Sequence, residues 1–288
     1  MTDKQREINK TNSIQPMHDL VTHVSVASQK HKKKKNMRTL TLGFFILLSF
    51  CCFGQVSVEM NLHCGTKNKK ALEYFNSGNF GLQTNRLEGA AKLFYGAVKL
   101  DSTFCDAWDN LAVCYRKMGR YEDAFNAGIR SLMIDSTNVT AWSNCGNAAF
   151  LQHDIYKALK SYDNLQRIVP NNPEGYYGKS IVLYYVGSLA EARNNIIKAE
   201  QVYRTNHLKI GNEVYLLKGF IEYKIGNKIE AQGIFEKIYS KFKDNPELNY
   251  FLGKCLLENE NDTNKSKKYI DKALKLGYVI ETETNNKK

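Results

Sequence analysis

The 288-residue chain has only four prolines, and none of them interrupts a stretch with helical periodicity. Pro170, Pro173 and Pro246 lie at junctions between such stretches, where a helix must stop or start. No segment of useful length alternates apolar and polar residues, which is the pattern of a half-buried strand. The scarcity of helix breakers and the lack of strand patterns predict an all-α fold.

The sequence also lacks the motifs that carry enzyme chemistry. It has no H-E-x-x-H, no G-x-S-x-G and no paired carboxylates in an apolar setting. Segment 173–180 ends like a phosphate-binding loop, but Pro173 stands where that loop needs glycine, and no strand precedes it. Three histidines follow residue 54, and none has a second ligand at metal spacing: His63, His153 and His207. We therefore expect no catalytic residue, no cofactor and no metal.

Cysteine usage gives no disulfide framework. Five of the seven cysteines follow residue 54, an odd number, and no two form a C-x-x-C pair. Cys114, Cys145 and Cys255 lie near small-residue positions of predicted helices, so we interpret them as compact core residues. A Cys105–Cys114 bridge is not expected, because nine residues along a helix span about 13 Å. Cys64 lies outside the periodic region, where pairing between two molecules is the alternative to a free thiol.

The strongest positive signal is a period of 34 residues. Alanines recur at this spacing at Ala90, Ala124, Ala158 and Ala192. Twelve positions before each alanine stands a small residue: Gly78, Ala112, Gly146 and Ser180. Four positions earlier stands an aromatic residue: Tyr74, Trp108, Trp142 and Tyr176. A period of this size is typical of stacked helix-turn-helix units, in which only small residues let two helices approach to about 8–10 Å.

Two stretches carry the fuller motif: the first fits W-x2-L-G-x2-Y with Ala112 in the glycine place, and the second repeats this pattern and completes it with A-x3-[FY] and a proline. They are residues 107–124 and 141–170. The motif positions are Trp108, Leu111, Ala112, Tyr115, Ala124, Trp142, Gly146, Ala158 and Pro170. These residues resemble the tetratricopeptide repeat family, over residues 71–278. The resemblance implies a right-handed α-solenoid of stacked helix-turn-helix repeats.

The recurring alanine, small and aromatic positions, which we call the ladders, divide the chain into about six repeats. The predicted units are a lead-in at 55–70, repeats at 71–104, 105–138, 139–172, 173–211, 212–245 and 246–278, and a disordered tail at 279–288. Between Ala192 and Ala231 the spacing widens to 39 residues, which predicts five extra residues near 203–211. Gly219 and Gly253 take the small-residue place in the last two repeats. The sixth repeat lacks the ladder alanine, as suits a terminal cap.

The amino-terminal region predicts export. Residues 40–53 form a 14-residue apolar run behind Arg38, shorter than the about 20 residues that span a bilayer. The run fits a signal peptide at 37–54, with cleavage before Gln55. The chain is then periplasmic or extracellular, and its bacterial signal style and composition favour a cell envelope.

This interpretation leaves residues 1–36 as a non-native upstream extension or a disordered tail, with translation starting at Met37 instead of Met1. The alternative is a membrane anchor through residues 38–54, with the preceding lysines holding the tail inside. A lipoprotein is disfavoured, since Phe50 precedes Cys51 where a small residue is needed. The net charge of +12 falls to +6 after residue 54 and is spread thinly, so no nucleic acid partner is expected.

The resemblance further implies that the first helix of each repeat lines a concave groove for a peptide or a partner helix. The helix faces that the ladders leave unused carry the candidate contact residues Asp106, Asp109, Val113, Arg116, Lys117, Ser143, Asn147, Phe150, Tyr177, Ile181, Tyr184 and Tyr185. Aromatic residues flanked by charge are typical of binding hot spots. The alternative for each residue is packing against the adjacent repeat.

One binding mode of the family is not expected here, the clamp of cations that holds a terminal carboxylate. The comparable positions carry Phe75, Asp106, Asp109 and Asn144. We predict an exported, non-catalytic adaptor for one protein or peptide partner. The alternatives are a structural component of the envelope that associates with itself, a membrane-anchored repeat protein, and an enzyme whose site is assembled from scattered residues.

Overall fold

The computed structural model describes residues 62–280 and builds this range entirely from helices and connecting turns. The helices are α2 (Lys69–Gln83), α3 (Leu87–Leu100), α4 (Cys105–Lys117), α5 (Tyr121–Ile134), α6 (Val139–Leu151), α7 (Ile155–Ile168), α8 (Pro173–Tyr185), α9 (Leu189–Thr205), α10 (Asn212–Lys224), α11 (Lys228–Phe242), α12 (Pro246–Glu260) and α13 (Thr263–Lys275). The predicted all-α solenoid is confirmed. The predicted upstream extension, signal peptide and cleavage site lie outside the described residues, as do residues 55–61 of the lead-in and most of the tail.

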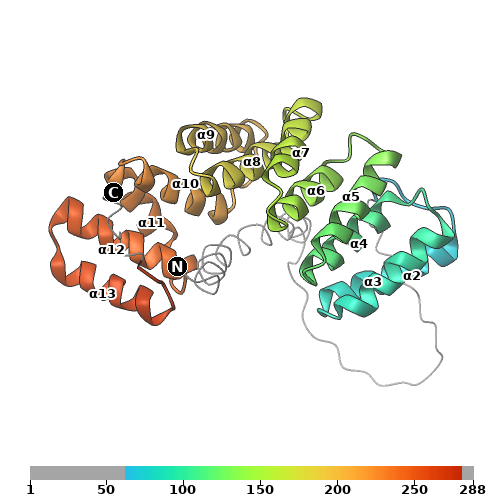
Figure 1. The fold of residues 1–288 in the computed structure, drawn as a ribbon, viewed down its shortest axis with the longest axis horizontal. Coiled ribbons are helices and arrows are strands. Elements are labelled where there is room, and N and C mark those ends of the chain that lie inside the picture. The colour runs from blue at the N-terminus through green and yellow to red at the C-terminus, as the bar shows by residue number, and fades with distance from the viewer. Residues whose placement is uncertain (1–61, 281–288) are drawn as a thin grey trace, which may run out of the picture.

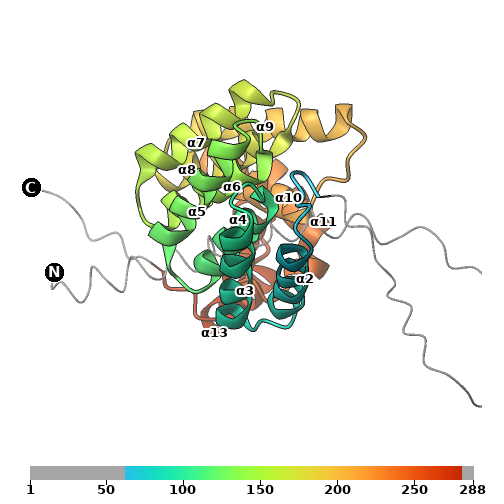
Figure 2. The ribbon, with the colours of Figure 1, turned by 90° about the vertical axis from the view of Figure 1, so that its right-hand side faces the viewer.

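The helices form consecutive pairs that stack into an arch (Figure 1). Each helix packs mainly on its neighbours in the chain, and α6 and α8 lie on the inner side of the arch while α7 and α9 lie on the outer side. Figure 2 looks along the arch from the α2–α3 end. None of the described helices is both long enough and apolar enough to cross a membrane.

Close contact between a glycine and an aromatic ring joins the helices of three pairs, α2–α3, α6–α7 and α10–α11. The ring of Tyr162 on α7 packs against Gly146 on α6, where an added Cβ would lie 2.6 Å from a ring carbon. It packs as closely on Gly178 of α8, where that distance would be 2.1 Å. Phe235 and Gly219 make the same contact between α11 and α10. The rings four residues after Ala90, Ala158 and Ala231 thus explain why the facing glycine must be small.

The turns within the pairs explain a second recurring residue. Gly119, Gly187 and Gly226 adopt φ of 76°, 80° and 96°, a left-handed conformation that is inexpensive only for glycine. His153 takes the same place in the third repeat with φ of 65°. Its role is that of a turn residue.

The fourth repeat departs from the others where the sequence places its extra residues. Helix α9 has 17 residues, whereas α3, α5 and α7 have 14 each. The added length prolongs α9 to Thr205, and a connection follows before α10 begins at Asn212. This extension creates the polar cluster described below.

Two glycine substitutions test the packing rule. Gly178→Ala forces a methyl group into the Tyr162 ring, so we expect a loss of about 1–3 kcal/mol in the free energy of unfolding. Gly233 on α11 is the matched control, because no atom lies within 4 Å of an added Cβ. Gly233→Ala should gain about 0.5–1 kcal/mol. Urea unfolding followed by circular dichroism measures both, and equal effects of the two substitutions would contradict the packing rule.

Candidate functional site

Seven of the residues predicted to line a groove belong instead to the packed core. They are Asp109, Val113, Arg116, Asn147, Phe150, Tyr177 and Ile181. In these positions the adjacent repeat covers the helix face, which corrects the prediction of an open contact surface. The other five side chains keep an exposed part, and their contact with a partner stays a prediction: Asp106, Lys117, Ser143, Tyr184 and Tyr185.

A group of polar side chains lies where α8 and α10 begin and α9 ends. It comprises Glu174 and Tyr177 from α8, Tyr203 from α9 and Glu213 from α10, and we call it the Glu174 cluster. The Tyr203 hydroxyl donates to Glu174 Oε1 at 2.7 Å. Glu174 Oε2 and the Tyr177 hydroxyl are buried without a hydrogen-bond partner. Buried polar atoms normally have partners, so two orphaned atoms in one cluster are notable.

The extension of α9 brings Tyr203 into this cluster. Eleven residues after the ladder alanine, α3 and α5 have already ended, and the caps are Asp101 and Asp135. Eleven residues after Ala192 stands Tyr203, and α9 continues to Thr205. The cluster therefore depends on a departure from the repeat pattern.

Acidic residues occupy the second position of four first helices. They are Asp106 on α4, Glu174 on α8, Glu213 on α10 and Glu247 on α12. The positive end of each helix favours a carboxylate at this place. The Tyr184 hydroxyl donates to Glu247 Oε1 at 3.2 Å, so this bond joins α8 to α12 across α10.

Burial changes the acidity of two of these carboxyl groups. Desolvation raises the pKa of Glu174 to about 7, against the opposing effect of the hydrogen bond from Tyr203. Desolvation likewise raises the pKa of Glu247 to about 7, opposed by Tyr184 and by the charge of Lys224. Among the described residues, no cation pairs with Glu174. Perturbed carboxyl groups of this kind are candidates for functional sites.

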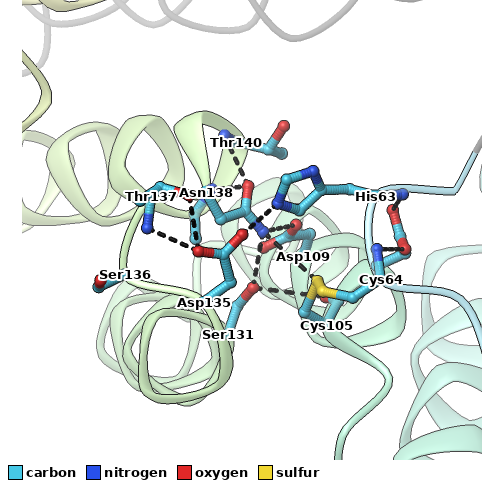
Figure 3. Close-up of polar contacts among 12 residues, drawn as sticks. His63, Cys64, Cys105, Asp109, Ser131, Asp135, Ser136, Thr137, Asn138 and Thr140 are labelled. Carbon is cyan, nitrogen blue, oxygen red and sulfur yellow. Dashed lines mark hydrogen bonds and ion pairs between the residues drawn. A yellow bond between two sulfur atoms is a disulfide. The ribbon is translucent and has the colours of Figure 1, made fainter. Parts of the chain in front are cut away.

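A second polar site lies at the amino-terminal end, where residues 62–68 run back over the repeats (Figure 3). We call this segment the strap. A disulfide joins Cys64 to Cys105 at the start of α4. The backbone N–H groups of His63 and Cys64 donate to the Asp106 carboxylate at 3.0 and 2.8 Å. The His63 ring contacts Asp135, which lies between α5 and α6.

A buried network lies beside the disulfide. Asn138 Nδ2 donates to Asp109 Oδ2 at 2.8 Å and to Ser131 Oγ at 3.0 Å, and it lies 3.7 Å from Cys105 Sγ. Asp109 Oδ1 has no hydrogen-bond partner, and burial raises the pKa of Asp109 to about 7. Asn138 Oδ1 also accepts from the backbone N–H groups of Thr140 and Ala141 at the start of α6, so this side chain links the second and third repeats.

The arrangement around the strap leaves no open metal site. Cys64, Cys105 and Asp106 form the one group of three or more ligand residues in the described range whose ligand atoms lie close enough to share a metal ion. Both sulfur atoms are bonded to each other, and the Asp106 carboxylate accepts two backbone hydrogen bonds. These contacts give the group a structural role.

Arg116 is the most unusual member of the core. Its side chain is 1% exposed, and none of its three guanidinium nitrogens has a hydrogen-bond partner. Burial lowers the pKa of this guanidinium, opposed by the nearby hydroxyls of Tyr162 and Tyr121. An unpaired buried cation costs several kcal/mol, so Arg116 is an energetic burden on the fold.

Stacked helical pairs, a small-residue ladder and sites built from helix ends define an α-solenoid repeat protein. Residues 106–138 and 246–276 match the family model of the tetratricopeptide repeat. The chain belongs to the tetratricopeptide repeat family. An uncharacterised protein of Methanocaldococcus jannaschii is 34% identical over 67 residues, which are 23% of this chain and 78% of that protein.

Solved structures share the fold. The APC/C hetero-tetramer Cut9–Hcn1 superposes with a TM-score of 0.64 at 13% identity, over 72% of this chain and 40% of that chain. PilF of Pseudomonas aeruginosa gives 0.60 at 18% identity, over 69% of this chain and 88% of its own. A tetratricopeptide repeat protein from Parabacteroides merdae gives 0.55 at 16% identity, over 73% and 81%. At these identities the likeness establishes the fold alone, and the chain spans less than half of the Cut9–Hcn1 chain.

The disulfide corrects the prediction from cysteine spacing. Cys64 pairs within the chain, with a partner 41 residues away, because the strap folds back onto α4. No spacing motif reveals this contact, since it depends on the path of a segment without periodicity. The prediction for Cys114, Cys145 and Cys255 is confirmed, because all three are free and buried.

Reduction should loosen the amino-terminal repeats. A disulfide across a separation of 41 residues restricts the unfolded chain, so its loss should cost about 2–4 kcal/mol. Urea unfolding with and without a reductant measures the loss, and hydrogen exchange locates it in residues 62–138. The Cys64→Ser variant is the control, because reductant should leave it unchanged. If reductant does not change the unfolding curve of the natural chain, the stabilising role of the disulfide is contradicted.

The raised carboxyl pKa values predict a dependence of stability on pH. Glu174 and Glu247 have unfolded pKa values near 4.5 and folded values of about 7, so the native state holds more protons between these limits. Stability contributed by their neutral forms is therefore present below about pH 4.5 and is lost as pH rises to about 7. Unfolding midpoints between pH 5 and 8 should fall less steeply in the double variant Glu174→Gln, Glu247→Gln. Identical slopes would show that neither group is buried as described.

Proposed function

We propose that this chain is an exported, non-catalytic adaptor that binds one protein or peptide partner along the inner side of the arch. The tetratricopeptide fold is in general a scaffold for protein–protein interaction. The carrying observation is the stack of first helices, α6 and α8 among them, on the inner side of the arch. Stacked repeats give a long, continuous surface of this kind without a separate domain for binding.

Half-buried tyrosines support a partner on these helices. Tyr185 ends α8 and packs edge-on against Phe150 of α6, with ring centroids 5.2 Å apart. The ring is held by its neighbour while part of it stays exposed. A fixed, partly exposed aromatic residue brings contact area at little cost in entropy.

The disulfide supports the exported location. Cys64–Cys105 needs an oxidising compartment to persist, such as the bacterial periplasm or the cell exterior. The short apolar run before Gln55 is consistent with that compartment. Self-association is a second candidate, because the chain exposes apolar side chains at its carboxy-terminal end. They are Leu274, Leu276, Val279 and Ile280.

Affinity capture of a carboxy-terminally tagged chain from its own cells tests the adaptor. We expect a stoichiometric envelope protein in the eluate and bait peptides that begin at Gln55. Tyr185→Ala should lose the partner, because it removes the exposed ring from α8. Tyr156→Ala is the matched control, since Tyr156 on α7 is 72% exposed and lies on an outer helix.

Three results would overturn the proposal. Bait that keeps residues 1–36 together with cytoplasmic partners would refute export. Equal partner loss in the Tyr185 and Tyr156 variants would refute the inner binding surface. If the molecular mass grows with protein concentration and no other protein is captured, the self-associating component replaces the adaptor as the proposed function.

A further inference from the structure

We propose that the Glu174 cluster binds a cationic side chain, lysine or arginine, presented by an extended segment of a partner protein. The proposal deepens the proposed function, since it names the chemistry of the partner and one place where that partner is anchored.

The cluster combines acidic groups with a buried, unpartnered floor. Glu174, Tyr203 and Glu213 are each partly exposed, so the cluster reaches the surface. Tyr177 lies beneath them at 2% exposure, and its hydroxyl has no partner. Burial raises the pKa of Tyr177 above its usual range, and the charges of Glu213 and Glu174 raise it further, so the three groups lie within electrostatic reach of one another. An ammonium or guanidinium group fits this arrangement, because it carries several hydrogen-bond donors and no acceptor.

The nearby groups supply no such cation. The titratable groups facing Glu174 are Tyr177 on its own helix, Tyr203 on α9 and Glu213 on α10, with Tyr162 of α7 behind Tyr177. Lys218 on α10 is engaged elsewhere, with Glu200 and Glu230. An incoming cation would therefore be the first positive charge in the cluster, and its hydrogen bonds would be charge-assisted.

The chain itself shows how an extended segment docks at this position. Asp106 is the second residue of α4 and stands 68 residues, two full repeats, before Glu174. There the strap lies against the carboxylate and donates the backbone N–H groups of His63 and Cys64. At α8 the equivalent carboxylate receives no backbone donor of this kind from a described segment, and its Oε2 has no hydrogen-bond partner. The same edge of the solenoid is thus suited to a second extended segment.

The positive end of α8 alone does not account for the cluster. A helix terminus explains an acidic residue at the second position, as in α10. It does not explain why α9 is prolonged to bring Tyr203 onto Glu174, or why Glu174 Oε2 and the Tyr177 hydroxyl stay unpartnered. A cation that contacts both orphaned atoms would account for these features together.

Binding should depend on pH in a defined direction. With a pKa of about 7, the Glu174 carboxyl is mostly neutral at pH 6 and mostly ionised at pH 8. A cation binds the ionised form, so its affinity is present above pH 7 and is lost as pH falls. Between pH 8 and pH 6 this linkage gives about a tenfold loss of affinity.

Calorimetric titration of the purified chain with acetylated, amidated pentalysine tests the site. The chain carries net positive charge, so non-specific attraction to this probe is weak. We expect saturable binding at one site at pH 8 and affinity about tenfold lower at pH 6. Glu174→Gln should weaken binding at pH 8 at least tenfold and abolish the pH dependence. Glu191→Gln is the matched control, because Glu191 is an exposed glutamate in the first turn of α9.

A second variant keeps the test independent of folding. Glu213→Gln changes the cluster's other carboxylate and should weaken pentalysine binding without lowering the unfolding midpoint. The proposal is overturned if pentalysine does not bind at pH 8, or if Glu174→Gln binds as tightly as the natural chain. If the Glu174→Gln variant still captures the envelope partner, the cation site is refuted and the adaptor function is retained. Pentalysine binding with no captured partner would support the site and refute the adaptor.

Discussion

The contact between a glycine on a first helix and an aromatic ring on a second helix holds three of the six described helical pairs together. Tyr162 shows this most clearly, because its ring fits against Gly146 within its own repeat and against Gly178 of the next. One side chain thus fixes both the pairing of two helices and the stacking of two repeats. Since each repeat packs mainly on its neighbours, stability accumulates locally along the arch.

Because the stack is held together locally, its stability depends on whether each buried polar group has hydrogen-bond partners. Glu222 is fully buried on α10, yet Arg193 of α9 and Asn227 donate to both of its oxygens, so repeats four and five are joined by a satisfied network. Arg116 and Glu174 are different, because each has buried polar atoms without partners. The contrast separates polar groups that hold the stack together from those that weaken it, and the latter are candidates for a role in binding.

The sequence predicts the regular part of this structure well. The alanine and aromatic ladders identify the helices and the crossing residues, and Gly119, Gly187 and Gly226 mark the turns, because each feature depends on contacts within one repeat. The Cys64–Cys105 bridge and the Glu174 cluster could not be predicted in this way. Both depend on where an aperiodic segment or a helix extension lies relative to another repeat. The burial of Tyr177 and Arg116 likewise depends on how the adjacent repeat covers the helix face.

The irregular features converge on one position of the repeat. The strap and the prolonged α9 both reach an acidic residue at the second place of a first helix, Asp106 in one case and Glu174 in the other. At Asp106 the chain satisfies the carboxylate with its own backbone. At Glu174 it supplies a single tyrosine hydroxyl and leaves the second oxygen unpartnered. The scaffold thus modifies the same position in two repeats. At Asp106 the chain closes this position itself, whereas at Glu174 it retains a carboxylate able to receive a segment of a different protein.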